Sequence, residues 1–231
     1  MRCAVDLHIH SCLSPCGDEW MTPNNIVNMA VLKGLDMIAV ADHNSAANLP
    51  AVSAVAQAAG LALLPAMELN TAEEVHLLTY FPTVQQAIAC SDAVYAYLPE
   101  IENAPAIFGR QQVMDADDEP VREEKKLLIS ALTLGLDELT EMVRSFGGAA
   151  VPAHINRSSN GILGALGFIP PGADFAALEV SIGLPLPHKG LPQMKHLHSS
   201  DAHYLQDIFE RVEYIDLSEK SADGFFEWLS A

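Results

Sequence analysis

Short apolar runs alternate with amphipathic stretches along most of this chain, a pattern that predicts strands joined by crossover helices. The expected strands cover residues 4–9, 36–41, 61–67, 75–81, 149–155, 177–181, 197–200 and 211–217. Helices are expected at 22–33, 50–59 and 222–229. Thr22-Pro23 supports the first of these, because threonine caps a helix and proline suits its first position. The pattern therefore predicts an α/β fold.

Residues 83–147 do not follow this alternation of strands and helices. Helices are expected at 84–98 and 136–146, on either side of a polar stretch that contains the acidic run Asp115-Ala-Asp-Asp-Glu119. A chain of 231 residues suits one α/β domain with a well-filled core. We therefore expect one domain formed by residues 1–82 and 148–231, with a small, mostly helical subdomain inserted at 83–147.

Composition limits the classes of partner. The chain has 12 basic and 30 acidic side chains, which argues against a stable nucleic-acid complex. Bound divalent cations would reverse the field locally, so an enzyme that handles one phosphate remains possible. No run of about 18 apolar residues predicts a membrane span. The first strand begins almost at once and the four cysteines fit a reducing compartment, so we expect a cytoplasmic protein.

Histidines mark the candidate site. His8 and His10 are two residues apart on a predicted strand, so both imidazoles point to one face and could hold one ion. Further histidines and carboxylates arrive where other predicted strands end, at His43, Glu68, His154, Asp201 and His203, and His76 lies within a predicted strand. Active sites of α/β barrels lie at these strand ends. Mixed histidine and carboxylate groups in this arrangement are typical of a multinuclear hydrolytic site.

Seven motifs in this sequence resemble those of one known family. They are Asp6-Leu-His-Ile-His10, Gly34-Leu-Asp-Met-Ile-Ala-Val-Ala-Asp-His43-Asn44, Met67-Glu68, Val75-His76-Leu, Ala153-His154, Glu179-Val180 and Ser200-Asp201-Ala-His203. Their order and their spread over residues 6–203 resemble the PHP (polymerase and histidinol phosphatase) family of metal-dependent phosphoesterases. The resemblance implies a distorted seven-stranded (β/α)7 barrel with a site for two or three divalent metal ions (Zn, Mn or Fe).

The resemblance also implies a ligand set. One ion would be held by His8, His10, Glu68 and Asp201. Glu68 would bridge to a second ion bound by His76 and His154. A third ion would be held by His43, His203 and one residue from the loop after His10.

That loop departs from the family's pattern, in which an aspartate is the ligand. Counting back from Thr22-Pro23, which matches the family's helix start, places Asp18 at the ligand position after three inserted residues. Cys16 is the rival, because thiolates favour zinc, and a Cys12-x3-Cys16 pair could form a thiol site. Both cysteines could also merely pack in the loop. We predict Asp18 as the ligand.

Other polar residues have expected roles around the metals. Arg157 lies three residues after His154 and could clamp a phosphate, although it could also be an ordinary surface arginine. Asp201 or a histidine such as His203 could carry a proton, which makes these two and Arg157 the expected catalytic residues. Asp6 and Asp42 are expected to orient ligand histidines, and Glu179 to support the site. No role is assigned to Cys12, His188, His196 or His198.

These patterns predict a metal-dependent phosphoesterase that uses a metal-activated hydroxide. The expected substrate is a phosphate ester of a small molecule or of a nucleotide or RNA 5′ end, because the insertion resembles a family subgroup with that specificity. Two alternatives stay open. The chain could hydrolyse C–N or C–O bonds, or it could be a metal-stabilised regulatory module without turnover.

Overall fold

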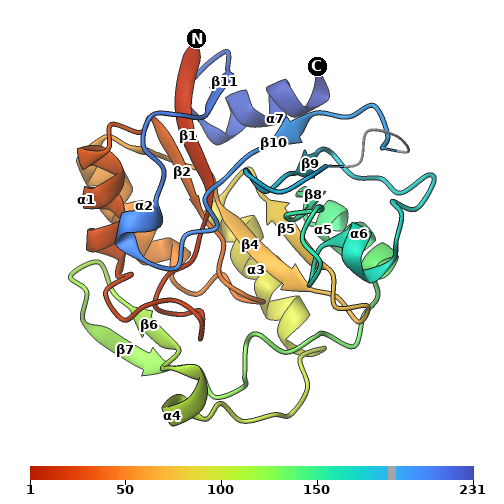
Figure 1. The fold of residues 1–231 in the computed structure, drawn as a ribbon. Helices are drawn as coiled ribbons and strands as arrows, with labels where there is room; N and C mark the ends of the chain where they lie inside the picture. The colour runs from red at the N-terminus through yellow and green to blue at the C-terminus, as the bar shows by residue number, and fades with distance from the viewer. Residues whose placement is uncertain (187–190) are drawn as a thin grey trace.

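A computed structural model describes residues 1–186 and 191–231 of the chain (Figure 1), and His188 lies outside the described residues. The fold is mixed α/β, as predicted. Its helices are α1 (Pro23–Leu32), α2 (Leu49–Ala59), α3 (Val84–Tyr95), α4 (Pro105–Phe108), α5 (Leu136–Ser145), α6 (Ile162–Ala165), the 3-10 turn η1 (Leu205–Asp207) and α7 (Ala222–Ser230). Its strands are β1 (Arg2–Ile9), β2 (Met37–Val40), β3 (Ala62–Leu63), β4 (Ala66–Asn70), β5 (His76–Tyr80), β6 (Gln112–Met114), β7 (Pro120–Glu123), β8 (Ala149–Pro152), β9 (Leu178–Glu179), β10 (His196–Leu197) and β11 (Tyr214–Asp216).

The strands form four small sheets, with the orders β11-β1-β2-β3, β4-β5-β8, β10-β9 and β6-β7. β1, β2 and β3 are parallel, whereas β5 runs antiparallel to both β4 and β8. Isolated bridges link Ile9 with Ala202 and His43 with Glu68. The described residues therefore do not form the closed seven-stranded barrel of the sequence prediction, because most of these strands are too short to continue the ladder from sheet to sheet.

Local signals placed the first two helices correctly. Thr22 caps α1, where its side chain accepts a hydrogen bond from the Asn25 N–H, and Pro23 begins the helix. α2 ends at Gly60, whose φ of 70° is the left-handed conformation that glycine adopts at little cost.

The single strand predicted at 61–67 is divided in the structure. β3 and β4 are separated by Leu64-Pro65, and β4 continues to Asn70. Proline has no N–H to donate to a ladder, so it suits the break between two strands. As a consequence, Glu68 lies inside β4 and not after the end of a strand.

Two apolar clusters form the core. The inner cluster contains Cys3, Val5 and Leu7 of β1 together with Tyr80 and Phe225. Phe225 belongs to α7, which lies near both termini and covers the end of the strands where β1 begins (Figure 1). The pairing of β1 with β2 shifts register between Asp6 and Ile9, and Ile9 then packs in the other cluster. Because of this shift, the alternation of side chains along β1 changes after Leu7. His8 and His10 therefore point to the same face of the strand as Leu7, and Ile9 points to the other face.

The segment 83–147 combines helices with a β-hairpin that the prediction of a mostly helical insertion did not include. α3 contacts β4 and α2, and α5 contacts β8. The β6–β7 hairpin lies against the loop after β1, where the Gln112 N–H donates to the Cys12 carbonyl at 3.0 Å. Asp118, in the turn of the hairpin, accepts hydrogen bonds from the Thr22 hydroxyl and the Asn24 N–H at the start of α1.

No helix in residues 1–186 and 191–231 is long and apolar enough to cross a lipid bilayer.

Candidate metal centre

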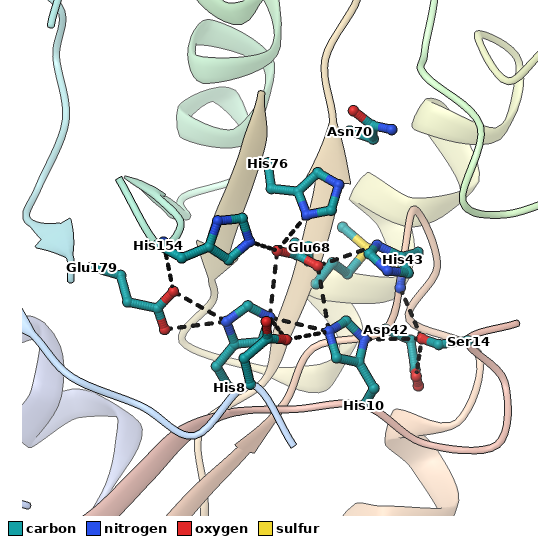
Figure 2. A network of polar contacts seen from close by, with 12 residues as sticks. His8, His10, Ser14, Asp42, His43, Glu68, Asn70, His76, His154 and Glu179 are labelled. Atoms are coloured by element: carbon teal, nitrogen blue, oxygen red, sulfur yellow. Dashed lines mark hydrogen bonds and ion pairs between the residues drawn. The ribbon is translucent and has the colours of Figure 1, made fainter. Parts of the chain in front are cut away.

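A buried carboxylate surrounded by imidazoles lies at the end of β1 that is opposite α7. Glu68 is 1% exposed, and its two oxygens lie within 3.4 Å of ring nitrogens of five histidines. These histidines are His8, His10, His43, His76 and His154, which Figure 2 shows converging on Glu68 from separate segments. His76 joins them from the first residue of β5, because β5 runs antiparallel to its neighbours and begins where they end.

One group of donors has the spacing of a coordination sphere. His8 Nε2 and His10 Nε2 are 3.2 Å apart, and Asp201 Oδ1 lies 3.3 Å from the first and 3.1 Å from the second. Glu68 Oε1 lies 3.4 Å from His8 Nε2, and Glu68 Oε2 lies 3.4 Å from His10 Nε2. Ligands around a tetrahedral zinc ion with bonds of about 2.0–2.1 Å are separated by roughly 3.3–3.4 Å. The donors of His8, His10 and Asp201 therefore lie at distances that fit one cation, and each of the two histidines faces a different oxygen of Glu68.

A second group shares Glu68. Its Oε1 lies 2.9 Å from His76 Nδ1 and 3.2 Å from His154 Nε2. His43 Nδ1 lies 3.1 Å from the other carboxylate oxygen. One carboxylate therefore faces donors on both of its sides, which is the arrangement expected of a bridging ligand.

A third group contains a cysteine. Ligand atoms of His10, Cys16, His43 and His203 all lie within 4.8 Å of one another. Asp18, the residue predicted from the sequence, is outside this group. Its carboxylate accepts a hydrogen bond from the Trp20 N–H at 3.0 Å, and its own N–H donates to the His203 carbonyl.

The local turn explains this difference between Cys16 and Asp18. The Ser14 N–H donates to Ser11 O at 3.1 Å, and the Gly17 N–H donates to Ser14 O at 2.9 Å. A Cβ at position 17 would lie 2.3 Å from Ser11 O, so this close approach requires glycine. The three inserted residues thus form a tight turn that places Cys16 at the cluster, and counting along the sequence could not show this.

Electrostatics in the cluster favour positive charge. Burial opposes protonation of His8, but Glu179, Asp201 and Glu68 outweigh it and raise the pKa of His8 well above its ordinary value. Burial likewise opposes protonation of His10, but the neighbouring carboxylates of Asp201 and Glu68 outweigh it and raise the pKa of His10 to about 9. Burial would raise the pKa of Glu68, yet the surrounding histidines, His76 first, hold it well below its usual range. Glu68 and Asp201 stay ionised, and their negative charge favours either protonated imidazoles or bound cations beside them.

Two other histidines in the cluster have lowered pKa values. Burial and the neighbouring charge on His10 lower the pKa of His43 well below its ordinary value, and the same two causes lower the pKa of His203. Neutral imidazole is the form that binds metals.

Buried polar atoms without partners point to the same conclusion. His43 Nδ1, Glu68 Oε2 and His154 Nδ1 are inaccessible to solvent and have no hydrogen bond. His43 Nδ1 and Glu68 Oε2 lie 3.1 Å apart, but their orientation does not make a hydrogen bond. Leaving a buried polar group unsatisfied costs about 1–3 kcal/mol. A cation between these two atoms would satisfy both, so the residues present fit a divalent-metal cluster.

Supporting side chains select the nitrogen that each histidine presents. Glu179 Oε1 lies 3.1 Å from His8 Nδ1, and Ser14 Oγ lies 3.1 Å from His10 Nδ1 while donating to Asp42. A proton held on each Nδ1 leaves Nε2 free to bind a metal. Asp42 therefore acts on His10 through Ser14.

Asp6 has a different partner from the one expected. It accepts hydrogen bonds from the backbone N–H groups of Ser200 and Phe209, and so holds the loop that carries Asp201.

Backbone conformation at the site is unusual. His154 has a φ of 30° and Asp201 a φ of 53°, in the left-handed region that residues other than glycine rarely adopt. Such conformations cost on the order of 1–3 kcal/mol and cluster at functional sites. Glu179 helps to hold the first of them, because its Oε2 accepts from the His154 N–H at 2.9 Å.

A cavity of about 140 Å³ opens onto the cluster. Besides donors already described, it is lined by Arg157, Ser159, Asn160 and Ile129. No sequence pattern singled out the last three, because ordinary loop residues carry no signal of what they face. A larger groove of about 810 Å³ lies between α2 and α3, but Asp92 is the only ionisable residue in its lining. The chemistry is therefore expected in the smaller cavity.

Arg157 lies at the edge of this cavity with its side chain 38% exposed. Its Nη1 donates to Asp201 Oδ2 at 2.5 Å, and its Nε donates to the Ser181 hydroxyl at 3.2 Å. Two other histidines without an assigned role lie outside the cluster. His196 is exposed on β10, and His198 pairs with Glu213.

The profile of the PHP domain family matches residues 6–157. No curated protein matches the chain.

Three solved structures resemble the fold. The lesion-specific endonuclease Q of Pyrococcus furiosus is 19% identical with a TM-score of 0.66, over 97% of this chain and 55% of that one. A putative metal-dependent phosphoesterase of Bifidobacterium adolescentis is 18% identical with a TM-score of 0.58, over 87% of each chain. An amidohydrolase of Chromobacterium violaceum is 18% identical with a TM-score of 0.59, over 98% of this chain and 96% of that one. The chain spans about half the length of the endonuclease.

Proposed function

The chain belongs to the PHP domain family, and on that premise we propose that it is a metal-dependent phosphoesterase. Its substrate would be a phosphate ester of a small molecule or of a nucleotide or RNA 5′ end. The observation that carries the proposal is a small cavity lined on one side by metal-binding donors and on its edge by Arg157. Under this proposal, the Arg157 guanidinium would bind phosphate beside the cations that the donors hold.

We assign the cations to the donor groups described above. His8, His10, Glu68 and Asp201 hold one ion, and Glu68 bridges to a second ion held by His76 and His154. A third ion lies near His43 and His203. Such ions, when bound, neutralise the charge of a phosphoryl group and lower the pKa of water.

The remaining steps fall to side chains at the cavity. The Arg157 guanidinium has N–H groups beyond those bonded to Asp201 and Ser181, and these bind a phosphate oxygen. Asp201 lines the cavity and carries the proton of the attacking water. If no third ion is bound to His203, this histidine can accept the proton of the attacking water instead.

The size of the cavity constrains the substrate. Sites for drug-sized ligands measure about 300–1,000 Å³, whereas this cavity measures about 140 Å³. Only the phosphoryl group enters, and the rest of the ester stays at the surface. A terminal phosphate therefore fits better than a phosphodiester inside a duplex. The net charge of −18 also disfavours a stable complex with a nucleic acid.

Endonuclease action is a second candidate, which the similarity to endonuclease Q favours. Hydrolysis of a C–N bond is a third, which the similarity to the amidohydrolase favours.

One panel of substrates separates these functions. The purified chain is freed of metal and loaded in turn with Zn²⁺, Mn²⁺ or Fe²⁺. It is then given p-nitrophenyl phosphate, nucleotides, a 5′-phosphorylated oligonucleotide, a duplex with an internal lesion, and a set of amides and lactones. We expect metal-dependent release of inorganic phosphate from monoesters. Cleavage of the duplex alone supports the endonuclease, and turnover of amides alone supports a C–N hydrolase. Fully loaded protein that acts on nothing supports a regulatory module.

A further inference from the structure

We propose that the Cys16 thiolate, together with His43 and His203, holds a thiophilic divalent cation such as zinc at the third metal position. The proposal rests on the proposed role of the cluster as a metal centre. It assigns to a cysteine the place that the sequence pattern gave to Asp18.

The geometry places Cys16 among metal-binding atoms. Its Sγ lies within 4.8 Å of ligand atoms of His43, His203 and His10, and Cys16 lines the same cavity as they do. The loop is held on both sides of Cys16, by the turn that ends at Gly17 and by the bond from the Asp18 N–H to the His203 carbonyl at 2.9 Å. The same bond fixes the backbone at Asp18, whose carboxylate caps the Trp20 N–H.

An unpaired nitrogen of His43 is an independent observation that points to a ligand. The His43 side chain is 3% exposed, and its Nδ1 has no hydrogen-bond partner. His43 also supplies a ligand atom to the donor group that contains Cys16. A buried imidazole nitrogen left unpaired beside a thiol and a second imidazole is explained by a cation that all three bind.

The other cysteines provide a contrast. Cys12 is buried, and its thiol lies 3.8 Å from the Gln112 carbonyl, to which it donates. Neither Cys12 nor Cys3 or Cys90 belongs to a donor group among the described residues. The structure therefore favours one cysteine at a metal position over a Cys12–Cys16 thiol pair.

A thiolate changes which metal this position selects. Soft thiolate ligands favour zinc, whereas carboxylates also suit hard ions such as manganese or magnesium. When the cation binds, the Cys16 S–H bond breaks, its proton leaves to solvent, and the sulfur electron pair forms the bond to the metal. No oxidant or reductant takes part.

Cobalt provides a direct readout that does not need activity. Metal-free protein is titrated with Co²⁺ while the near-ultraviolet thiolate-to-cobalt charge-transfer absorption and the number of ions bound are recorded together. We expect the native chain to develop this absorption as its third position fills. Cys16→Ser and Cys16→Asp should lose the absorption and still bind the other ions, whereas Cys12→Ser and Asp18→Asn should keep both the absorption and the full number of ions.

Zinc and manganese affinities extend the test. Cys16→Ser should weaken zinc at the third position by at least roughly tenfold, the lower end of what losing even a supporting partner costs. Cys16→Asp should restore binding with a preference shifted toward manganese. Absorption that persists in folded Cys16→Ser, or ions bound in full without any absorption in the native chain, would overturn the assignment of Cys16 alone. A native chain that binds no cobalt would overturn the metal centre as well.

Discussion

At the scale of single residues, the cluster is organised by the charge of Glu68. Five imidazoles surround this carboxylate, and burial deprives all of them of water. Without metal, protons on His8 and His10 supply the neutralising charge, because the pKa values of both are raised. Metal ions and protons therefore compete for the same nitrogen atoms.

This competition predicts how the stability of the metal-free protein depends on pH. A histidine whose folded pKa exceeds its unfolded value of about 6.5 stabilises the fold fully below pH 6.5. That contribution is lost as the pH rises through the folded value, which is about 9 for His10. We expect the free energy of unfolding to fall between pH 6.5 and 8.5, by at most about 1.4 kcal/mol per pH unit for each extra proton.

Urea denaturation of the chelated protein at constant ionic strength measures this trend. His43 and His203 oppose this trend near pH 6.5, where they are partly protonated only in the unfolded state, and they have little effect above about pH 7.5, where they are neutral in both states. The zinc-loaded protein is the control and should show the opposite trend, since protons displace metal at low pH. A metal-free protein that grows more stable toward pH 8.5 would mean that the two histidines are not protonated.

The guanidinium at the edge of the cavity gives a second prediction. We expect Arg157→Ala to lower kcat/KM on the best phosphate monoester by roughly 10- to 100-fold, because hydrogen bonds to a charged group contribute about 1.5–3 kcal/mol. Metal content, measured by elemental analysis, should change little. Arg157→Lys keeps the charge without the planar fork and should recover only part of the loss.

The outcome also tests the bond between Arg157 and Asp201. If metal content falls together with kcat/KM, Arg157 acts by orienting Asp201 as a ligand. Unchanged kinetics would mean that it is an ordinary surface arginine.

At the scale of elements, the sequence predicted the structural features that depend on residues close together in the chain, such as helix ends and strand faces. The start of α1 and the end of α2 follow from Thr22-Pro23 and Gly60, and the faces of β1 follow from alternation until the register shift. His8 and His10 share a face because they are two residues apart. The expected distorted barrel is not confirmed, since the sheets of the described residues are small and not closed, and pairing between distant strands leaves no local pattern from which closure could be predicted.

The loop after β1 shows the same limit at the site. Spacing alone pointed to Asp18, but hydrogen bonds within the turn bring Cys16 to the cluster and direct Asp18 to Trp20. Ser159 and Asn160 line the cavity for a similar reason, since the turn after His154 and not their residue type places them there.

This loop yields a third prediction. Gly17→Ala adds a Cβ that would lie 2.3 Å from Ser11 O, so the turn must open and displace Cys16. We expect a loss of about 1–3 kcal/mol in the free energy of unfolding, the usual cost of overpacking. One bound ion should be lost while the others remain.

A matched control separates the two effects. Gly60→Ala places alanine in a left-handed conformation at the end of α2, which costs about 1–2 kcal/mol, but nothing lies within 4 Å of the new Cβ. It should lower the melting temperature without changing the number of bound ions. A full metal content in Gly17→Ala would show that the turn does not position a ligand.

At the scale of the whole molecule, the acidic chain and its metals depend on each other. The charges that give the chain its formal charge of −18 repel one another in the compact state, and divalent ions bound as proposed would reduce this charge at the most buried carboxylates. Ligands that bind only the folded state stabilise it by about 2.7 kcal/mol at 100 times their Kd.

We therefore expect more than one divalent ion per chain, and a clear fall in melting temperature when a chelator removes them. Elemental analysis and thermal unfolding with and without chelator measure this. Added magnesium, which suits oxygen ligands better than imidazole, is the control and should not restore the lost stability. One ion at most, with no further binding on titration, would rule out the multinuclear assignment.

The contact between His10 and Asp201 joins residues that are 191 positions apart. During synthesis at about 5–20 residues per second, the second of them emerges roughly 10 to 40 s after the first. Glu68, His76 and His154 all precede residue 201, and their ligand atoms can meet while the nascent chain is still growing. Under the proposed assignment, the cation held by these three can bind first, and the cations that need Asp201 or His203 bind only after those residues have left the ribosome. The order of metal binding would then follow the order in which the ligand residues are synthesised.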